Sequence, residues 1–272
     1  MKKILSILLV AVMMLSVLSL TVAADTLTYS VAKDADGNSL NVKVVNGVEW
    51  VEENGKIKMP AGPISSFVLF DNKLATKRVE ATIHPNDLHG SGDDRNGIVF
   101  ALTDYDNDST FNMDGTDVSY YWAFISGWEG RICVLKMGKH NGWTLLSAGG
   151  DWSKSGTPLK DLGIENPADG VKLAAEWDNE GHIKVFVNGK LVEDITDTTG
   201  TPLTGDLYGM LVRKWGNTPE GTAFPYDAPV SSFIAGVKSK TETGDATVIV
   251  SLIALVAAMG TGIVIGKKRH FN

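Results

Sequence analysis

An acidic stretch holds the residues best suited to bind a metal ion. It contains Asp104, Asp106, Asp108 and Asp114. Alternating aspartates supply the hard oxygen ligands that calcium prefers, in a loop that can wrap around the ion. The stretch does not follow the EF-hand pattern, because Ser109 stands where that loop requires glycine. Two alternatives remain: an acidic surface loop after a strand, or a calcium site formed by these four aspartates.

Aromatic side chains form the second group of candidates. Tyr120, Trp122 and Phe124 alternate along a predicted strand and therefore share one face of it. One face of this strand must be core, and the other could be an exposed platform for sugar rings. Three further tryptophans lie in or beside glycine-rich segments, where side chains often form the rim of a site. The candidate sugar-binding residues are Tyr120, Trp122, Trp128, Trp152 and Trp215, with core packing as the alternative for each tryptophan.

Short β-type runs must position these side chains. Asp-Gly and Asn-Gly pairs, such as those at 36–37 and 188–189, separate the runs and are typical of tight turns. Runs at this spacing, without a convincing long amphipathic helix, predict an all-β, two-sheet antiparallel sandwich. The runs are 26–31, 40–45, 65–70, 78–83, 97–102, 120–125, 131–137, 143–147, 171–177, 182–187, 207–212 and 231–237.

Both ends of the chain predict a location outside the cytoplasm. Residues 1–24 have a basic start, an apolar run and small residues before Asp25, which are the three parts of a secretory signal peptide. Residues 247–266 contain no charge and are long enough, at about 1.5 Å per residue, to span a bilayer as a transmembrane helix. The basic tail 267–272 is expected to stay in the cytoplasm. The chain between these segments is therefore expected on the extracellular side.

Charge and cysteine content narrow the possible partners. The formal charge of the chain is -7, and the two terminal segments contain only basic charges, so the remainder is more acidic still. Such a surface repels phosphate backbones, which argues against nucleic acid as a partner. Cys133 is the only cysteine, so the region 25–238 must depend on its hydrophobic core rather than on disulfides. We interpret this region as one domain, because no linker or repeat divides it.

The short linker 239–246 contains Thr243 and Gly244, followed by the apolar span and the basic tail. This order resembles the cell-wall sorting signal of Gram-positive surface proteins, in which a sortase cuts between the threonine and glycine of a Leu-Pro-x-Thr-Gly motif. The resemblance implies a cut between Thr243 and Gly244 and attachment to peptidoglycan. Lys240 and Thr241 stand where that family has leucine and proline, so a variant sortase and simple membrane anchoring are the alternatives.

The segment 171–192 carries the clearest fold signal. It reads VKLAAEWDNEGHIKVFVNGKLV, a double hairpin in which Asn188 and Gly189 accept the positive φ of a two-residue loop. This hairpin resembles the concanavalin A-like jelly rolls, and within them the laminin G-like group. The resemblance implies a jelly-roll sandwich over 25–238, in which a sheet face or loop rim often binds sugar chains, sometimes with calcium.

Some members of that class are glycoside hydrolases, in which three carboxylates alternate on one strand. Glu176, Asp178 and Glu180 match this spacing. A retaining pair must lie about 5 Å apart and be held rigidly in a cleft. Because Asn179 is unfavourable inside a strand and Gly181 follows at once, the sequence favours a solvated turn. Catalysis by these three carboxylates is the alternative.

These features predict a surface-anchored, non-catalytic, lectin-like module that binds a glycan or polysaccharide. The expected partners of the C-terminus are a sortase and peptidoglycan, or the membrane. The expected location is the extracellular face of a Gram-positive-type cell. Two other functions remain open: a glycoside hydrolase or related sugar-cleaving enzyme, and a structural or adhesive surface protein that binds a protein partner.

Overall fold

The computed structural model describes the part of the chain that contains the predicted strands. The described residues are 27–45, 50–58, 65–85, 95–105, 117–126, 130–138, 142–151, 156–213 and 228–238. The chain divides into two units, Met1–Val237 and Lys238–Asn272, and every described strand belongs to the first. The predicted signal peptide 1–24 and membrane span 247–266 lie outside the described residues. Within the described ranges, no helix has the length and apolar content needed to cross a membrane.

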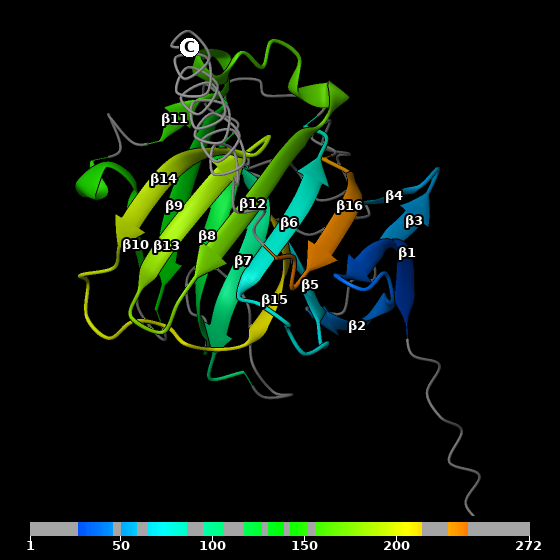
Figure 1. Cartoon of the computed structure of the whole chain (residues 1–272), viewed down its shortest axis with the longest axis horizontal. Coiled ribbons are helices and arrows are strands. Elements are labelled where there is room, and N and C mark those ends of the chain that lie inside the picture. Colours follow the sequence, from blue (N-terminus) through cyan, green and yellow to red (C-terminus); the bar gives the residue numbers. More distant parts are fainter. Residues whose placement is uncertain are drawn as a thin grey trace, which may run out of the picture. The chain divides into compact units, whose positions relative to one another are not determined.

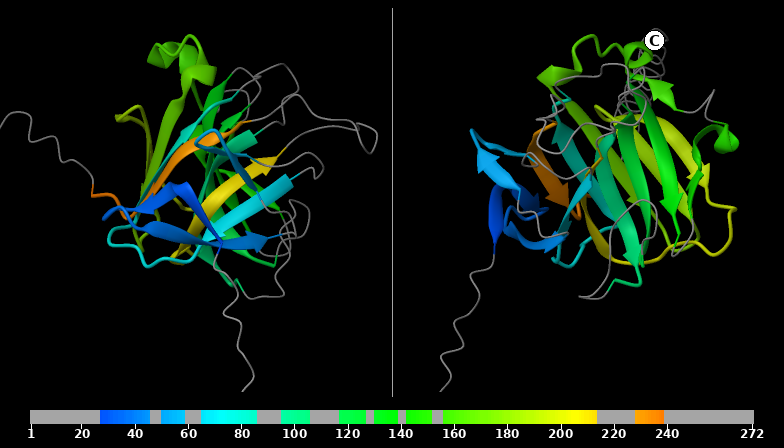
Figure 2. Two further views of the ribbon diagram at one scale, coloured as in Figure 1. Left: turned by 90° about the vertical axis from the view of Figure 1, so that its right-hand side faces the viewer. Right: turned by 180° about the vertical axis from the view of Figure 1, so that it is seen from behind.

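The strands form two sheets that share an edge. Sheet A contains, in order, β1 (Thr28–Asp34), β16 (Val230–Ala235), β6 (Arg78–Ile83), β12 (Val171–Trp177), β13 (His182–Val187) and β14 (Lys190–Thr196). Sheet B contains β2 (Ser39–Val45), β5 (Ser65–Phe70), β15 (Leu207–Arg213), β7 (Arg95–Thr103), β8 (Ser119–Ser126), β9 (Arg131–Met137) and β10 (Trp143–Leu145). Sheet A faces the viewer in Figure 1, and the view from behind in Figure 2 brings sheet B to the front.

Pairing is antiparallel throughout except between β1 and β16, which run parallel. The pairing of β1 with β2 connects the two sheets. Three short strands lie off this order. β3 (Val51–Glu53) pairs with β4 (Lys56–Lys58), which also pairs with β16, and β11 (Thr157–Pro158) pairs with β9. Three single-turn 3₁₀ helices, η1 (Ser147–Gly150), η2 (Leu159–Leu162) and η3 (Pro167–Asp169), complete the described elements.

The main hydrophobic core lies between the sheets. It takes alternate residues from strands of both sheets, such as Ala175 and Val185 from sheet A and Ile98 and Met210 from sheet B. Because neighbouring strand residues point to opposite faces, this core defines the inner face of each sheet, and the intervening residues define the outer face. A two-sheet sandwich with one shared core is the architecture that the sequence predicts.

A buried ion pair closes the core where the chain leaves β14. Lys136 of β9 donates to Asp197 Oδ2 at 2.6 Å, and the Tyr121 hydroxyl of β8 donates to the same oxygen at 2.7 Å. The backbone and hydroxyl of Thr199 donate to Asp197 Oδ1 at 2.8 and 2.6 Å. Burial acts to raise the pKa of Asp197, but the hydrogen bonds from Lys136, Thr199 and Tyr121 outweigh it and hold the pKa below its usual range. The carboxylate therefore ties the end of sheet A to sheet B.

The structure confirms the all-β prediction and most strand positions. The predicted runs 65–70, 78–83, 131–137, 171–177 and 182–187 match the strands to the residue. The predicted strand 143–147 is too long: β10 ends at Leu145, and Ser147 begins η1. At this point the Ser147 hydroxyl accepts a hydrogen bond from the backbone N–H of Val134 at 2.8 Å. This side-chain contact takes the place of a further backbone pair between β10 and β9.

Candidate functional site

The outer face of sheet B is a second, separate hydrophobic cluster. Its buried members come only from the strands of sheet B and from Val118, directly before β8. They are Phe67, Leu69, Val99, Leu102, Val118, Tyr120, Trp122, Phe124, Cys133, Leu135, Met137, Leu145 and Leu211. A sheet face that meets water normally carries polar side chains. This face instead has the composition of a core or of a binding surface.

Aromatic rings dominate the centre of this face. The rings of Trp122 and Phe124 lie 4.5 Å apart between centroids, and Phe67 meets Tyr120 edge to face at 5.4 Å. Phe67 belongs to β5 and Tyr120 to β8, so the second contact reaches across β15 and β7. Gly209 of β15 lies on that path without a side chain, and a Cβ there would lie 1.9 Å from the Val68 carbonyl oxygen. The large rings therefore lie over the sheet where smaller residues leave room.

Tyr120 and Trp122 are both fully buried, with 0% of each residue exposed. The prediction of an exposed aromatic platform at these two residues is wrong, because both faces of β8 are buried along its whole length. The Tyr120 hydroxyl and the Trp122 indole nitrogen have no hydrogen-bond partner among the described residues. Burial raises the pKa of Tyr120, and the charge of Arg213 acts in the opposite direction. Leaving two such groups unpaired carries a free-energy cost of about 1–3 kcal/mol each.

Trp143 is the exposed aromatic residue of this face. Strand register pairs Trp143 with Met137, and Met137 with Tyr120. Directly opposite residues in an antiparallel ladder share a face, so Trp143 lies on the outer face of sheet B in the same cross-strand row as Tyr120. It is 44% exposed. The sequence reasoning missed Trp143 as a site residue, although it begins the predicted run 143–147.

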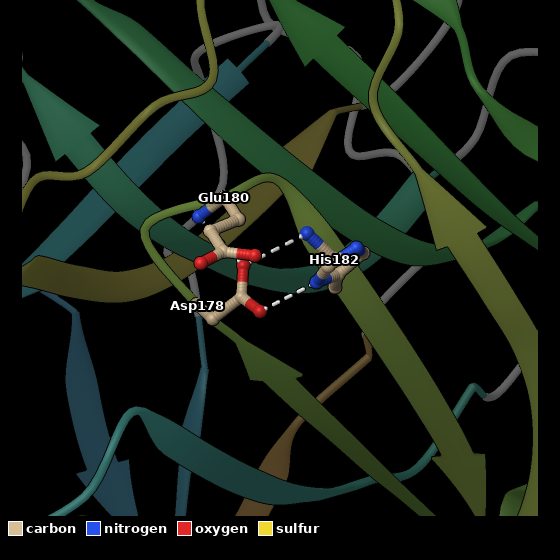
Figure 3. A group of neighbouring side chains, drawn as sticks. All are labelled: Asp178, Glu180 and His182. Atoms are coloured by element: carbon tan, nitrogen blue, oxygen red, sulfur yellow. Dashed lines mark hydrogen bonds and ion pairs between the residues drawn. The ribbon is translucent and has the colours of Figure 1, made fainter.

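The hairpin between β12 and β13 brings Asp178, Glu180 and His182 together (Figure 3). One ligand atom from each residue lies within 4.8 Å of the others. Asp178 accepts hydrogen bonds from the backbone of Glu180 at 2.8 Å and of His182 at 3.0 Å, and it contacts His182 Nδ1 at 2.7 Å. Burial acts to raise the pKa of Asp178, but these hydrogen bonds outweigh it and lower the pKa. Asp178 thus stabilises a solvent-exposed turn, as the sequence favours.

Glu176 belongs to a different environment from the other two predicted carboxylates. It lies on β12, on the outer face of sheet A, where Arg78 Nη1 donates to its Oε1 at 2.5 Å. Arg78 also pairs with Glu80 at 3.0 Å, and Lys172 pairs with Glu80 at 2.6 Å. Glu176 is thus held in an ion network while Asp178 and Glu180 lie in the turn. Among the described residues, these three carboxylates form no pair held rigidly in a cleft.

The remaining predicted site residues are only partly described. Asp104 is exposed and has a positive φ of 61° at the end of β7. Its predicted partners Asp106, Asp108 and Asp114 lie outside the described residues, so the calcium site stays a prediction. Three candidate tryptophans and the sorting residues also lie outside the described residues; they are Trp128, Trp152, Trp215, Thr243 and Gly244.

Comparison with known proteins gives distant structural neighbours. No family model and no curated protein matches the sequence. A carbohydrate-binding module, CBM66 from Bacillus subtilis, is 16% identical with a TM-score of 0.48, covering 71% of this chain and 93% of the module. A protein of unknown function with a galectin-like fold from Bacillus subtilis is 12% identical with a TM-score of 0.47, covering 71% and 87%. A legume lectin-like domain from Entamoeba histolytica is 13% identical with a TM-score of 0.44, covering 77% and 96%. Similarity at this level transfers neither a ligand nor a reaction to this chain.

Proposed function

We propose that the chain is a non-catalytic carbohydrate-binding module of the concanavalin A-like jelly-roll type, displayed at the extracellular face of a Gram-positive-type cell. The signal peptide 1–24 would export it. The segment 247–266 would retain it in the membrane, or a sortase acting between Thr243 and Gly244 would attach it to peptidoglycan. The glycan would bind at the exposed Trp143 on the outer face of sheet B.

The exposed position of Trp143 carries the proposal. An indole ring that is 44% exposed presents apolar area with few rotatable bonds, and such side chains are efficient contacts for ligands with apolar ring faces. Met137 and Tyr120 extend the same row into the aromatic cluster.

Substitution of Trp143 tests the proposed site. We expect Trp143→Ala to weaken glycan binding about tenfold, which corresponds to about 1.4 kcal/mol, as measured by calorimetric titration with a glycan chosen from an array. Leu191→Ala is the matched control, because Leu191 has the same exposed fraction, 44%, but lies on β14 of sheet A. Equal binding by the wild type and Trp143→Ala would contradict the proposed site.

Release of reducing sugar distinguishes binding from cleavage. We expect no release from any glycan that the chain binds. Release that disappears in Glu176→Gln would replace the proposed function with a sugar-cleaving one.

A further inference from the structure

A serine and a histidine meet at one end of sheet A. His84 directly follows β6, and Ser231 is the second residue of β16. The pairing of Val230 with Ile83 brings these two strand ends together. His84 Nε2 lies 2.7 Å from the Ser231 hydroxyl oxygen, which is a hydrogen-bond distance. Strand pairing thus places a hydroxyl nucleophile against an imidazole, although the two residues lie far apart in the sequence.

A backbone carbonyl fixes the direction of this hydrogen bond. His84 Nδ1 lies 3.1 Å from the carbonyl oxygen of Ala168, which belongs to η3. A carbonyl oxygen can only accept, so Nδ1 carries the proton of the neutral imidazole and Nε2 is left as the acceptor. The Ser231 hydroxyl therefore donates to Nε2. This is the direction in which an imidazole, itself oriented by a third group, activates a serine hydroxyl as general base.

The histidine ring is held in this orientation by its surroundings. His84 is buried, with 8% of the residue exposed, and its backbone N–H donates to the Pro229 carbonyl oxygen at 2.9 Å. Gly170, directly after η3, lies against the ring: a Cβ there would lie 3.0 Å from His84 Cε1. Glycine therefore allows η3 to pack directly beside the imidazole, and the base has little freedom to turn away from Ser231.

Ser231 is the more accessible member of the pair. It is partly exposed, whereas His84 is buried. Val230 and Ser232 pair with consecutive residues of β6, so Ser231 is an extra residue in β16. A bulge of this kind changes the direction of a side chain relative to the regular ladder. Apart from His84, the Ser231 hydroxyl has no hydrogen-bond partner among the residues that the structure describes.

We infer that Ser231 is an activated nucleophile that accepts an acyl group from an ester. The Ser231 oxygen forms a bond to the ester carbonyl carbon, and the bond from that carbon to the leaving oxygen breaks. The hydroxyl proton passes to His84 Nε2 and then to the leaving oxygen, so the products are an acyl-serine and an alcohol. The inference goes beyond the proposed glycan binding at Trp143, which lies on the other sheet, and does not depend on it.

An activated ester, p-nitrophenyl acetate, tests the inference with the full chain. We expect a burst of p-nitrophenolate and an added acetyl group on Ser231, located by fragmentation of the peptide in a mass spectrometer. The neighbouring Ser232 is also partly exposed and provides the internal reference. We expect Ser231 to be acetylated about a hundredfold faster than Ser232, because general-base catalysis by a positioned side chain contributes at least about this factor.

Three variants identify the reacting groups. We expect Ser231→Ala to abolish the burst and His84→Gln to slow acetylation of Ser231 about a hundredfold. Ser232→Ala is the matched control and is expected to leave the burst unchanged. Thermal melting shows whether each variant is folded. If His84→Gln does not fold, the comparison of Ser231→Ala with Ser232→Ala still decides whether Ser231 is the nucleophile.

Two results would overturn the inference. The first is acetylation of Ser231 no faster than that of Ser232, which would show that Ser231 is an ordinary hydroxyl. The second is an unchanged rate in folded His84→Gln, which would leave the hydrogen bond between the two residues with a structural role alone. Neither result affects the proposed glycan binding, because the Trp143→Ala variant tests that function separately.

Discussion

The two outer faces of this sandwich follow opposite rules. On sheet A, β12 alternates between exposed or half-exposed polar residues, such as Lys172 and Glu176, and buried core residues. On sheet B, every residue of β8 is buried. The outer face of sheet A thus carries charged side chains, exposed at Lys172 and buried at Arg78 and Glu80, whereas both faces of β8 in sheet B are buried.

The difference shows which face is available for a function other than folding. On the outer face of sheet A, Arg78 and Lys172 both pair with Glu80, although Arg78 Nε has no hydrogen-bond partner among the described residues. The outer face of sheet B leaves Tyr120 and Trp122 with unpaired polar atoms. Those two atoms are buried, so Trp143, which is 44% exposed in the same cross-strand row as Tyr120, is the residue of this face that a ligand can contact.

The largest expected effect compares one phenylalanine from each outer face. Phe124 is fully buried on sheet B, and Phe186 is partly exposed on sheet A beneath the Arg78 guanidinium, 4.8 Å from its ring. We expect Phe124→Ala to lower the free energy of unfolding by about 3–5 kcal/mol, because it removes a buried ring and leaves a cavity. We expect Phe186→Ala to cost about 1 kcal/mol, the typical value for a point substitution.

Urea denaturation of both variants measures these costs. Similar losses in the free energy of unfolding for Phe124→Ala and Phe186→Ala would contradict the account, since the outer face of sheet B would then not behave as a core. A change in the slope of the transition for Phe124→Ala alone would indicate that the variant no longer unfolds in two states.

The next effect compares two lysines in ion pairs. Lys136 is 11% exposed in its side chain and pairs with fully buried Asp197, whereas Lys172 is 49% exposed and pairs with Glu80. We expect Lys136→Met to cost about 3 kcal/mol, because it leaves a buried carboxylate with fewer partners. We expect Lys172→Met to cost less than about 1 kcal/mol.

The effect of Lys136 also depends on pH. The pKa of Asp197 is lower in the folded state than in the unfolded chain. Ionised Asp197 therefore stabilises the fold at pH values above the ordinary aspartate pKa of about 3.9, and this stabilisation is lost as the pH falls through the pKa of the folded state. The difference in melting temperature between wild type and Lys136→Met should therefore narrow in acid. A difference that stays constant from pH 7 to pH 3 would show that the pair is not charged in the folded state.

Sequence patterns predicted most strands because apolar alternation and turn residues act over a few neighbouring positions. Alternation of apolar residues and the Asn188-Gly189 turn specify β12 and β13 without reference to the rest of the chain, whereas only the first three residues of β14 fell within the predicted double hairpin. The turn at Asp178 was also predictable, since Asn179 and Gly181 are poor strand residues. Short strands such as β3 (Val51–Glu53) were missed because three residues carry too little pattern to recognise.

The site was less predictable, because it depends on pairing between distant strands. The sequence identified Tyr120 and Trp122 as a shared face, but their burial depends on packing between distant strands, such as the contact of Tyr120 with Phe67 across two intervening strands.

The central claim is that ligand binds the outer face of sheet B and not that of sheet A. Hydroxyl-radical footprinting with mass spectrometry tests it directly, because Trp143 and Leu191 have equal exposed fractions, 44%, on opposite sheets. A saturating concentration of a glycan that the chain binds is expected to reduce modification of Trp143 and to leave Leu191 unchanged. Protection of Leu191 with Trp143 unaffected would contradict the claim.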